Sequence, residues 1–297
     1  MTRILDLDGG PLTALRGREL TAAVAAAEGR TLVGEVRPNT AVLAGPDGTG
    51  GVCNTELAAA FGADVIVLNM LELVFDGAVW NLPALGRFDS LDALARHLGR
   101  PVGVNLEPGD VPAARKATVG NARLLCDQGA ALLCVTANPA TGADLADIAR
   151  TSEQLRAALG DDAAIWSGKM HMAGRTEPLD ASGMRRVAEA GADGVLVPLP
   201  GTVPGVTREI AAEAVRAVHA AGAIAMGTVG TSQEGSHRSL VPQLALNAKE
   251  IGVDAHHFGD AWLAGVMDPE LLYDYSVAIR GRRHTWSRMA RSIRTRP

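Results

Sequence analysis

Several short apolar segments of the sequence end in polar side chains that alternate with other residues. Residues two apart on an extended chain point to the same side, so each such pair can face one site. The pairs are Glu35 with Arg37, Asn105 with Glu107, Thr136 with Asn138, and Lys169 with His171. Two further segments end in Asn69 and in His257-Phe258-Gly259-Asp260. A single pair could be a solvated loop, but the whole set, at one end of apolar segments, indicates an active site.

These side chains could move protons next to a carbonyl group. A lysine desolvated in a pocket can act as a base or form an imine, and a histidine titrates near neutrality. We therefore predict Lys169 and His171 as base and electrophile, and Glu107 and Glu35 as further proton-transfer groups. The residues predicted to bind the substrate beside them are Arg37, Asn69, Asn105 and Asn138.

A glycine-rich segment follows the seventh apolar segment. Residues 227–236 contain three glycines and four hydroxyl residues, with no lysine or arginine. Backbone N–H groups in such a loop can surround an anion, which predicts a phosphate site. Its predicted members are Gly230, Thr231, Ser232, Gly235, Gly259 and Asp260. In the alternative interpretation, the glycines only permit a tight turn.

No cofactor is firmly predicted, but a divalent metal ion is an alternative means of polarising a carbonyl group. Glu107, His171, His257 and Asp260 offer oxygen and nitrogen ligands suited to magnesium, manganese or zinc. Their spacing does not enforce such a site.

Three functions remain open at this point. The leading hypothesis is an enzyme that acts on a small phosphorylated sugar or sugar-acid by proton abstraction next to a carbonyl, as an isomerase, epimerase or aldolase-type lyase. The first alternative is a metal-dependent lyase, mutase or hydrolase on a phosphorylated or phosphonate substrate. The second is a non-catalytic sensor that binds a phosphosugar.

A regular spacing of glycines indicates which elements position these residues. A glycine followed by a short apolar run occurs eight times, at intervals of 30 to 37 residues. Such a glycine can end a helix, and an apolar run of this kind is typical of a parallel strand covered by helices. Eight units predict an α/β fold, a single (β/α)8 TIM barrel, with an open doubly wound sheet as the competing fold. The predicted strands are 31–36, 64–69, 102–106, 132–136, 164–169, 194–198, 224–228 and 255–258.

The repeat predicts one domain over residues 1–297, since no linker divides it. Residues 1–28 form an N-terminal helical lead, 29–274 the barrel, and 275–297 a C-terminal helix with a basic tail. Among the arginines at 280–296 the only Phe, Trp or Tyr is Trp286, so we expect a solvated or subunit-contacting helix rather than a nucleic-acid surface. We also expect a homo-oligomer.

The composition excludes several classes of protein. Of 297 residues, 47% are hydrophobic and 21% charged, which excludes a disordered chain, and the formal net charge is -5. No apolar run approaches the roughly 18 residues that span a bilayer, and no secretory leader is visible. The three cysteines lack the spacing of a zinc site. We expect a cytoplasmic protein with reduced thiols and no membrane partner.

Segments 27–30, 54–64, 201–205, 230–235, 256–261 and 278–281 resemble those of an uncharacterised bacterial family of TIM-barrel proteins. That family is labelled loosely as phosphoenolpyruvate-phosphonomutase-like or haloacid-dehalogenase-like, and the resemblance implies a phosphate-binding barrel. Phosphonomutase and isocitrate-lyase relatives carry a lysine-lysine-cysteine-glycine-histidine type gating loop, from which Gly168-Lys169-Met170-His171 departs. Leu5-Asp6-Leu7-Asp8-Gly9-Gly10 is similar to the first motif of haloacid-dehalogenase-type phosphatases, whose first aspartate is a nucleophile.

Overall fold

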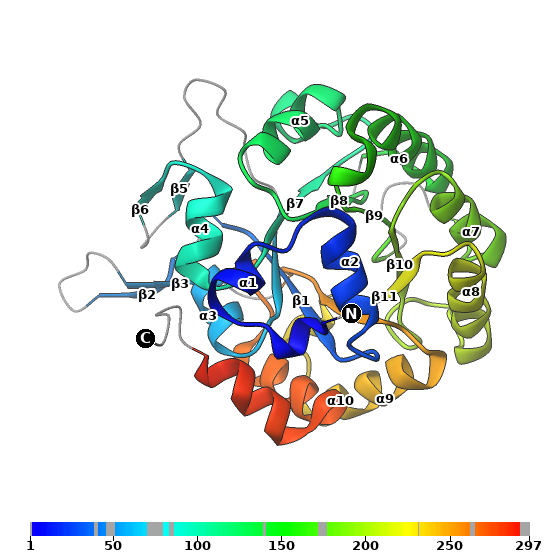
Figure 1. The fold of residues 1–297 in the computed structure, drawn as a ribbon. Coiled ribbons are helices and arrows are strands. Elements are labelled where there is room, and N and C mark those ends of the chain that lie inside the picture. The colour runs from blue at the N-terminus through cyan, green and yellow to red at the C-terminus, as the bar shows by residue number, and fades with distance from the viewer. Residues whose placement is uncertain are drawn as a thin grey trace.

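Eight parallel strands close into a barrel in the computed structural model, in the order β1-β12-β11-β10-β9-β8-β7-β4 (Figure 1). The structure describes residues 2–38, 41–45, 51–69, 80–82, 86–138, 141–171, 177–230, 232–261 and 265–291. The barrel strands are β1 (Thr31–Val36), β4 (Val65–Leu68), β7 (Val102–Leu106), β8 (Leu133–Val135), β9 (Ile165–Gly168), β10 (Gly194–Pro198), β11 (Ile224–Val229) and β12 (Ala255–Phe258). Because β1 pairs with both β4 and β12, the predicted closed barrel is confirmed and the open sheet is wrong.

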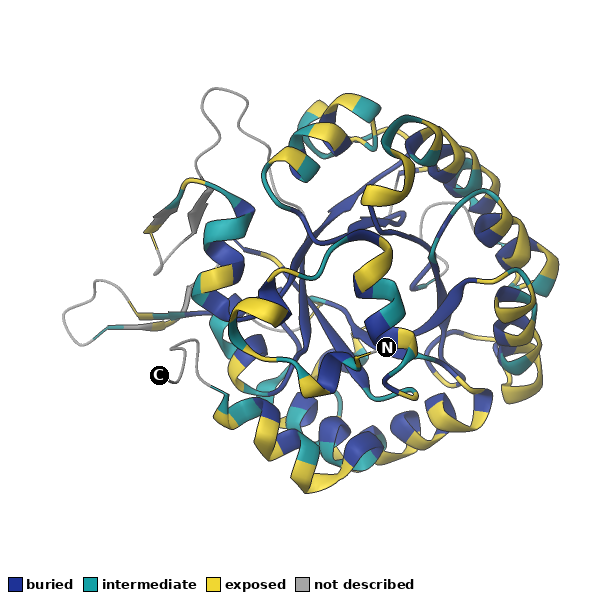
Figure 2. Ribbon diagram, in the orientation of Figure 1, coloured by how far each residue is buried: buried dark blue, intermediate teal, exposed yellow. Residues whose placement is uncertain are grey.

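A helix follows each strand and covers the outside of the barrel. These helices are α3 (Asn54–Ala60), α4 (Leu91–Leu98), α5 (Val119–Asp127), α6 (Leu145–Leu159), α7 (Ala181–Glu189), α8 (Arg208–Ala220), α9 (Val241–Ile251) and α10 (Pro269–Ala290). Each turns a buried face to the strands and an exposed face outward (Figure 2). Gly99 and Gly252 end α4 and α9 in the left-handed conformation, as the glycine spacing predicts.

The N-terminal lead closes one end of the barrel. It consists of η1 (Ile4–Asp6), α1 (Gly9–Thr13) and α2 (Gly17–Ala25), and these elements lie across the middle of the barrel in Figure 1. Leu20 and Val24 of α2 belong to the same buried cluster as Trp166 in the barrel interior. The Trp166 indole Nε1 donates to Thr21 Oγ1 at 3.0 Å. The lead therefore covers the end of the barrel at which the strands begin.

A buried ion-pair group fixes α10 against the barrel and the lead. The Asp64 carboxylate accepts from Arg280 Nη1 at 2.7 Å and from Arg288 Nε at 2.6 Å. Arg288 Nη2 also donates to the carbonyl of Ile4 at 2.7 Å. Arg280 and Arg288 are 5% and 2% exposed, so the prediction of a solvated helix is wrong for these two arginines. Within α10, Gly281 has non-helical backbone angles (φ 70°, ψ 166°), so the chain kinks there and two helical stretches follow the last barrel strand.

Smaller elements, which the glycine repeat did not predict, lie in the loops. Two antiparallel sheets pair β2 (Ala41–Ala44) with β3 (Gly51–Cys53) and β5 (Trp80–Leu82) with β6 (Gly86–Phe88). The short helical turns outside the lead are η2 (Ala113–Arg115), η3 (Gly160–Asp162), η4 (Gln233–Gly235) and η5 (Arg238–Leu240). In the described part of the chain, no helix combines the length and apolar character needed to cross a membrane.

Candidate active site

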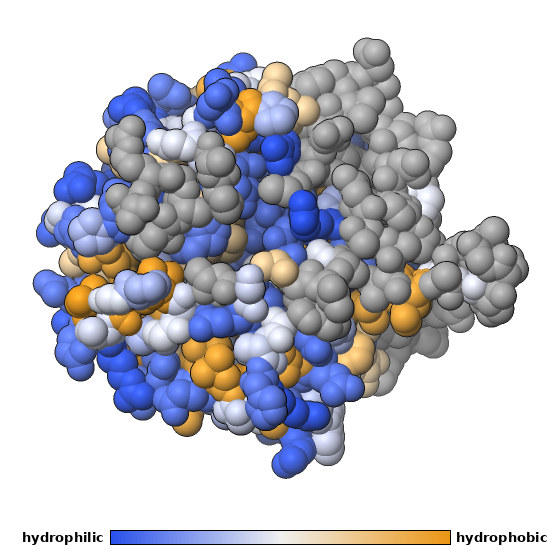
Figure 3. Space-filling view, turned by 180° about the vertical axis from the view of Figure 1, so that it is seen from behind, coloured by the Kyte–Doolittle hydropathy of each residue, from blue (hydrophilic) through white to orange (hydrophobic). Residues whose placement is uncertain are grey.

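A cavity of about 370 Å³ lies at the carboxyl end of the barrel. It is lined by Arg37, Asn138, Met170, His171, Gly230, Ser232, Glu234, Gly259, Asp260 and Ala261. These residues follow five different strands, as expected where parallel strands end together. Seen from behind, hydrophilic residues gather near the centre of that face (Figure 3).

The predicted asparagines form a continuous chain of hydrogen bonds at this end. Asn69 Nδ2 donates to Asp260 Oδ2 at 3.1 Å, and Asn105 Nδ2 donates to Asn69 Oδ1 at 2.9 Å. Thr136 Oγ1 donates to Asn105 Oδ1 at 3.1 Å, and Asn138 Nδ2 is 3.5 Å from Asn69 Oδ1. Because each amide orients the next, the chain holds Asn138 at the cavity wall.

Two of the carboxylates at this end have cationic partners. Glu107 is 1% exposed, with Oε1 at 3.8 Å from Arg115 Nη1. Its Oε2 accepts from the backbone N–H of Asn138 at 3.2 Å, which fixes the loop after β8. Asp260 Oδ2 lies 3.8 Å from the Nε of Arg37, whose side chain is half exposed. These contacts make Glu107 an anchor of the site, and they place a guanidinium at the cavity.

Lys169 is fully buried and forms an ion pair. Its Nζ donates to Glu177 Oε1 at 2.8 Å, and the same oxygen accepts from the backbone N–H of Leu145 at 2.9 Å. An adjacent carboxylate favours the ammonium form, whereas imine formation requires the neutral amine. The contact therefore favours a fixed positive charge at Lys169.

His171 lies at the cavity wall beside that charge. Burial, and then the positive charge of Lys169, lower the pKa of the imidazole below 6.5. The ring is therefore neutral at pH 7 and can accept a proton from a bound molecule. Of the predicted base and electrophile, His171 has the protonation state of a base.

Glu35 and His257 lie together in the barrel interior, and both are fully buried. His257 Nε2 is 3.6 Å from Glu35 Oε2, and neither residue has a side-chain hydrogen bond within the described ranges. Burial, followed by repulsion from Asp260, Glu234 and Glu107, raises the pKa of Glu35 well above its usual value. Burial lowers the pKa of His257 to about 3. Burial therefore favours the uncharged form of both groups.

The four predicted metal ligands are not assembled into one site. Glu107 faces Arg115, Asp260 faces Asn69 and Arg37, and His257 lies beside Glu35. Across the residues that the structure describes, no three histidine, cysteine, aspartate or glutamate side chains are placed to hold a metal ion. The described side chains therefore do not assemble the metal site that was the alternative to metal-free catalysis.

The glycine-rich segment differs in part from the predicted anion loop. β11 extends through Val229, so Gly227 belongs to the strand, where it packs against Leu199 and Val253. Gly230 and Ser232 line the cavity, and Gly235 ends η4. Thr231 lies outside the described residues.

A side chain that sequence reasoning did not single out, Glu234, occupies the space above Gly259. A Cβ atom on Gly259 would overlap the Glu234 carboxyl group, so this glycine makes room for a carboxyl. Glu177 and Arg115 were also missed. All three lie in loops or short turns, where strand alternation carries no information.

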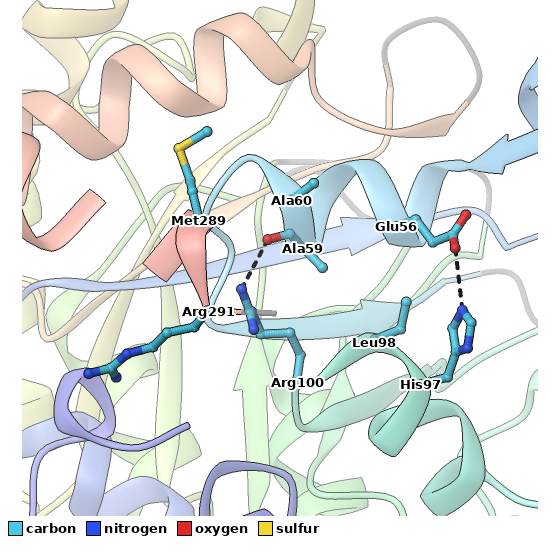
Figure 4. Close-up of a pocket in the computed structure, with 8 residues that line it drawn as sticks. All are labelled: Glu56, Ala59, Ala60, His97, Leu98, Arg100, Met289 and Arg291. Carbon is cyan, nitrogen blue, oxygen red and sulfur yellow. Dashed lines mark hydrogen bonds and ion pairs between the residues drawn. The ribbon is translucent and has the colours of Figure 1, made fainter. Parts of the chain in front are cut away.

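A second cavity, of about 230 Å³, lies outside the barrel between α3, α4 and the end of α10 (Figure 4). At one side His97 Nε2 lies 3.3 Å from Glu56 Oε1, and at the other Arg100 Nη2 donates to the carbonyl of Ala59 at 3.1 Å. These polar groups join neighbouring elements, and none of the predicted site residues lines this cavity. It is part of the outer wall of the barrel.

Asp6 lies in η1, in the lead that covers the opposite end of the barrel. Its carboxylate is 2.7 Å from Arg3 Nε and nearly half exposed. Asp6 is therefore remote from the cavity, and the haloacid-dehalogenase-like resemblance has no support.

The chain belongs to the family described as a domain of unknown function, DUF7916, whose model matches residues 5–295. A search of curated proteins finds no match. An archaeal fructose-1,6-bisphosphate aldolase, solved with its catalytic lysine bound to the carbinolamine intermediate of the substrate, is similar in structure. The TM-score is 0.52 at 15% identity, over 88% of this chain and 96% of that one.

Two further solved structures resemble this chain. An oxaloacetate acetylhydrolase has a TM-score of 0.50 at 16% identity, over 85% of this chain and 83% of the other. A 2,3-dimethylmalate lyase, a member of the PEP mutase/isocitrate lyase superfamily, has a TM-score of 0.48 at 16% identity, over 89% and 80%. At these identities the likeness concerns the fold.

Proposed function

We propose that this member of the DUF7916 family is a carbon–carbon lyase. Its substrate is a small anionic β-hydroxy carbonyl compound, which it cleaves between the α- and β-carbons. The observation that carries the proposal is an uncharged histidine, His171, placed in a polar cavity beside the buried cation Lys169. An aldolase and an acetylhydrolase of similar fold support it.

The cavity offers the groups that retro-aldol cleavage requires. His171 removes the hydroxyl proton, the oxygen forms a new carbonyl, and the electrons of the broken carbon–carbon bond move onto the carbon next to the original carbonyl. The positive charge of Lys169 stabilises the negative charge that develops there. Asn138, held by the asparagine chain, can donate to the carbonyl oxygen.

The finer proposal concerns the substrate, a phosphorylated sugar or sugar-acid. The Arg37 guanidinium and the backbone after β11, at Gly230 and Ser232, border the same cavity. A phosphate or carboxylate group bound there would orient the reacting carbon toward His171. This arrangement supports an anionic substrate, and the experiment must separate the two anions.

A panel of β-hydroxy carbonyl compounds tests the function. Each compound is supplied in phosphorylated and unphosphorylated form, with and without a carboxylate, and the carbonyl products are trapped with a hydrazine reagent. We expect cleavage of at least one anionic member, and a loss of about 100-fold or more in kcat for His171→Asn. Cleavage that survives His171→Asn contradicts the proposed base.

A parallel assay with a chelator addresses metal dependence. Activity that is lost on EDTA treatment and restored by magnesium, manganese or zinc would favour the metal-dependent alternative. Ligand binding without turnover of any panel member would favour the sensor.

A further inference from the structure

We propose that Glu234 is the second proton-transfer residue of this site, the carboxyl group that delivers a proton to the carbon released by cleavage. The inference rests on the proposed lyase function and assigns His171 a partner within the cavity. Glu234 lies in η4, inside the segment whose glycines predicted an anion loop.

The position of the Glu234 carboxyl group is unusual for a structural residue. The residue is only 1% exposed, yet it borders the cavity that also contains His171. Its Oε2 atom has no hydrogen-bond partner in the part of the chain that the structure describes. A buried carboxyl group that only supports the fold normally has both oxygens hydrogen-bonded. We therefore infer that the unpaired oxygen of Glu234 contacts a molecule that binds in the cavity.

The backbone around Glu234 fixes that position. Ser232 is left-handed with φ of 68°, which is uncommon for a residue other than glycine. The carbonyl of Glu234 accepts from the N–H of Asp268 at 3.1 Å, and the carboxyl fills the space that a side chain at residue 259 would need. The left-handed backbone at Ser232 and the glycine at position 259 therefore both permit the Glu234 carboxyl group to lie at the cavity.

Burial and the nearby charges determine the protonation state of Glu234. Asp260 and Glu35 are acidic neighbours of Glu234. The cavity is also lined by His171, which is neutral, and by Arg37, whose guanidinium pairs with Asp260. Burial is the largest cause and, with repulsion from Asp260, raises the pKa of Glu234 to about 7, although hydrogen bonds from the backbone N–H groups of Glu234 and Ser232 act in the opposite direction. Both the acid and the carboxylate are then present at neutral pH, which suits a group that must give and take a proton.

The two residues act on different atoms of the substrate. His171 takes the hydroxyl proton and becomes the imidazolium. The bond electrons form the enolate, and the protonated carboxyl of Glu234 gives its proton to the enolate carbon and becomes the carboxylate. Exchange with water then returns a proton to Glu234 and removes one from His171, so the protons balance over one turnover.

Run backward, the second step can be observed alone. The carboxylate of Glu234 should remove a proton from the carbon of the carbonyl product, with His171 playing no part. Pyruvate and dihydroxyacetone phosphate serve as probes, incubated with enzyme in deuterium oxide while loss of the C–H signal is followed by NMR.

We expect wild type and His171→Asn to exchange hydrogen in at least one probe, and Glu234→Gln to exchange it at least 100-fold more slowly. Cleavage should be lost in both variants. If wild type exchanges hydrogen and Glu234→Gln does so within threefold of its rate, the inference is overturned, although the lyase function stands.

A titration separates this inference from the proposed function when no probe reacts. The protein is labelled with ¹³C at the glutamate carboxyl carbons, and the Glu234 signal is identified as the one missing from the spectrum of Glu234→Gln. In wild type this signal should titrate near pH 7. Titration near 4.5 overturns the role of Glu234 whatever the substrate.

Two alanine variants provide the matched pair for that titration. Gly259→Ala should displace the carboxyl and return its titration toward the usual range, because a Cβ there overlaps it. Gly120→Ala, where a Cβ meets only Thr118 Oγ1 at 3.9 Å, should leave the titration unchanged. An unchanged titration in Gly259→Ala would contradict the packing on which the inference depends.

Discussion

Replacement of Glu234 by glutamine should stabilise the protein at high pH and leave its stability nearly unchanged at low pH. The buried carboxyl binds its proton more tightly in the folded chain, where its pKa is about 7, than in the unfolded chain, where it is near 4.5. Between these values the folded state holds the extra proton, so stability falls as the pH rises. The loss begins above about 4.5 and is complete above about 7.

The magnitude follows from that difference. At about 1.36 kcal/mol for each pH unit, the carboxylate at position 234 destabilises the folded protein by roughly 3 kcal/mol above pH 7. The unfolding entropy of about 2.1 cal/mol/K per residue converts this into a rise of about 5 °C in the Tm of Glu234→Gln at pH 8.5. At pH 4.5 the variant and wild type should unfold within about 1 °C of each other.

Urea unfolding and thermal melts of both proteins, from pH 4.5 to pH 8.5, measure this difference. Glu35, whose pKa is also raised, titrates in both proteins, so much of its contribution drops out of the comparison. A difference that does not change with pH, or a variant less stable than wild type at pH 8.5, would refute a buried carboxyl of raised pKa at this position.

Three further outcomes follow from the contacts of other residues. Asp64→Asn should lower the free energy of unfolding by about 3 to 5 kcal/mol in urea titrations, because Arg280 and Arg288 lose their buried carboxylate; a loss under 1 kcal/mol would contradict a stabilising ion-pair group. Lys169→Met should lower kcat about 100-fold with KM changed only a few-fold, and borohydride with substrate should trap no adduct on Lys169; a trapped adduct would show imine chemistry. Ser90→Ala should lower stability by about 1 kcal/mol in urea titrations, since the Ser90 hydroxyl caps α4, and no change would contradict the cap.

The strands were predictable because their pattern is local. Expected and observed limits agree for β1, β7, β10 and β12, and they differ by one residue at one or both ends for the other four. Left-handed glycines and buried apolar runs mark these positions directly in the sequence. The two hairpins are local, but the glycine repeat marks only the parallel strands and did not predict them. The covering of one barrel end by the lead depends on packing between distant segments, which no local pattern specifies.

The candidate site was predictable only where strands position it. Glu35, Asn105 and Lys169 lie at strand ends, so alternation placed them at the correct end of the barrel. Glu177 and Glu234 are brought there by loops, and neither spacing nor side-chain type distinguishes them from other acidic loop residues. The glycines after β11 and β12 predicted an anion site. At Gly259, after β12, the absence of a side chain instead makes room for the carboxyl group of Glu234.

Apart from Glu177, which pairs with Lys169, four carboxyl groups at this end of the barrel divide according to their partners. Glu107 and Asp260 each face a guanidinium, so the negative charge of each has a compensating partner. Glu35 and Glu234 have no such partner among the described residues, and burial instead raises the pKa of each. When the environments of carboxyl groups in one site give them different pKa values, the groups can take different roles. Here two carboxylates stabilise the structure of the site, and the two with raised pKa values are suited to proton transfer. Glu234 is the one of the latter two that borders the cavity, so it is where proton transfer to a substrate can occur.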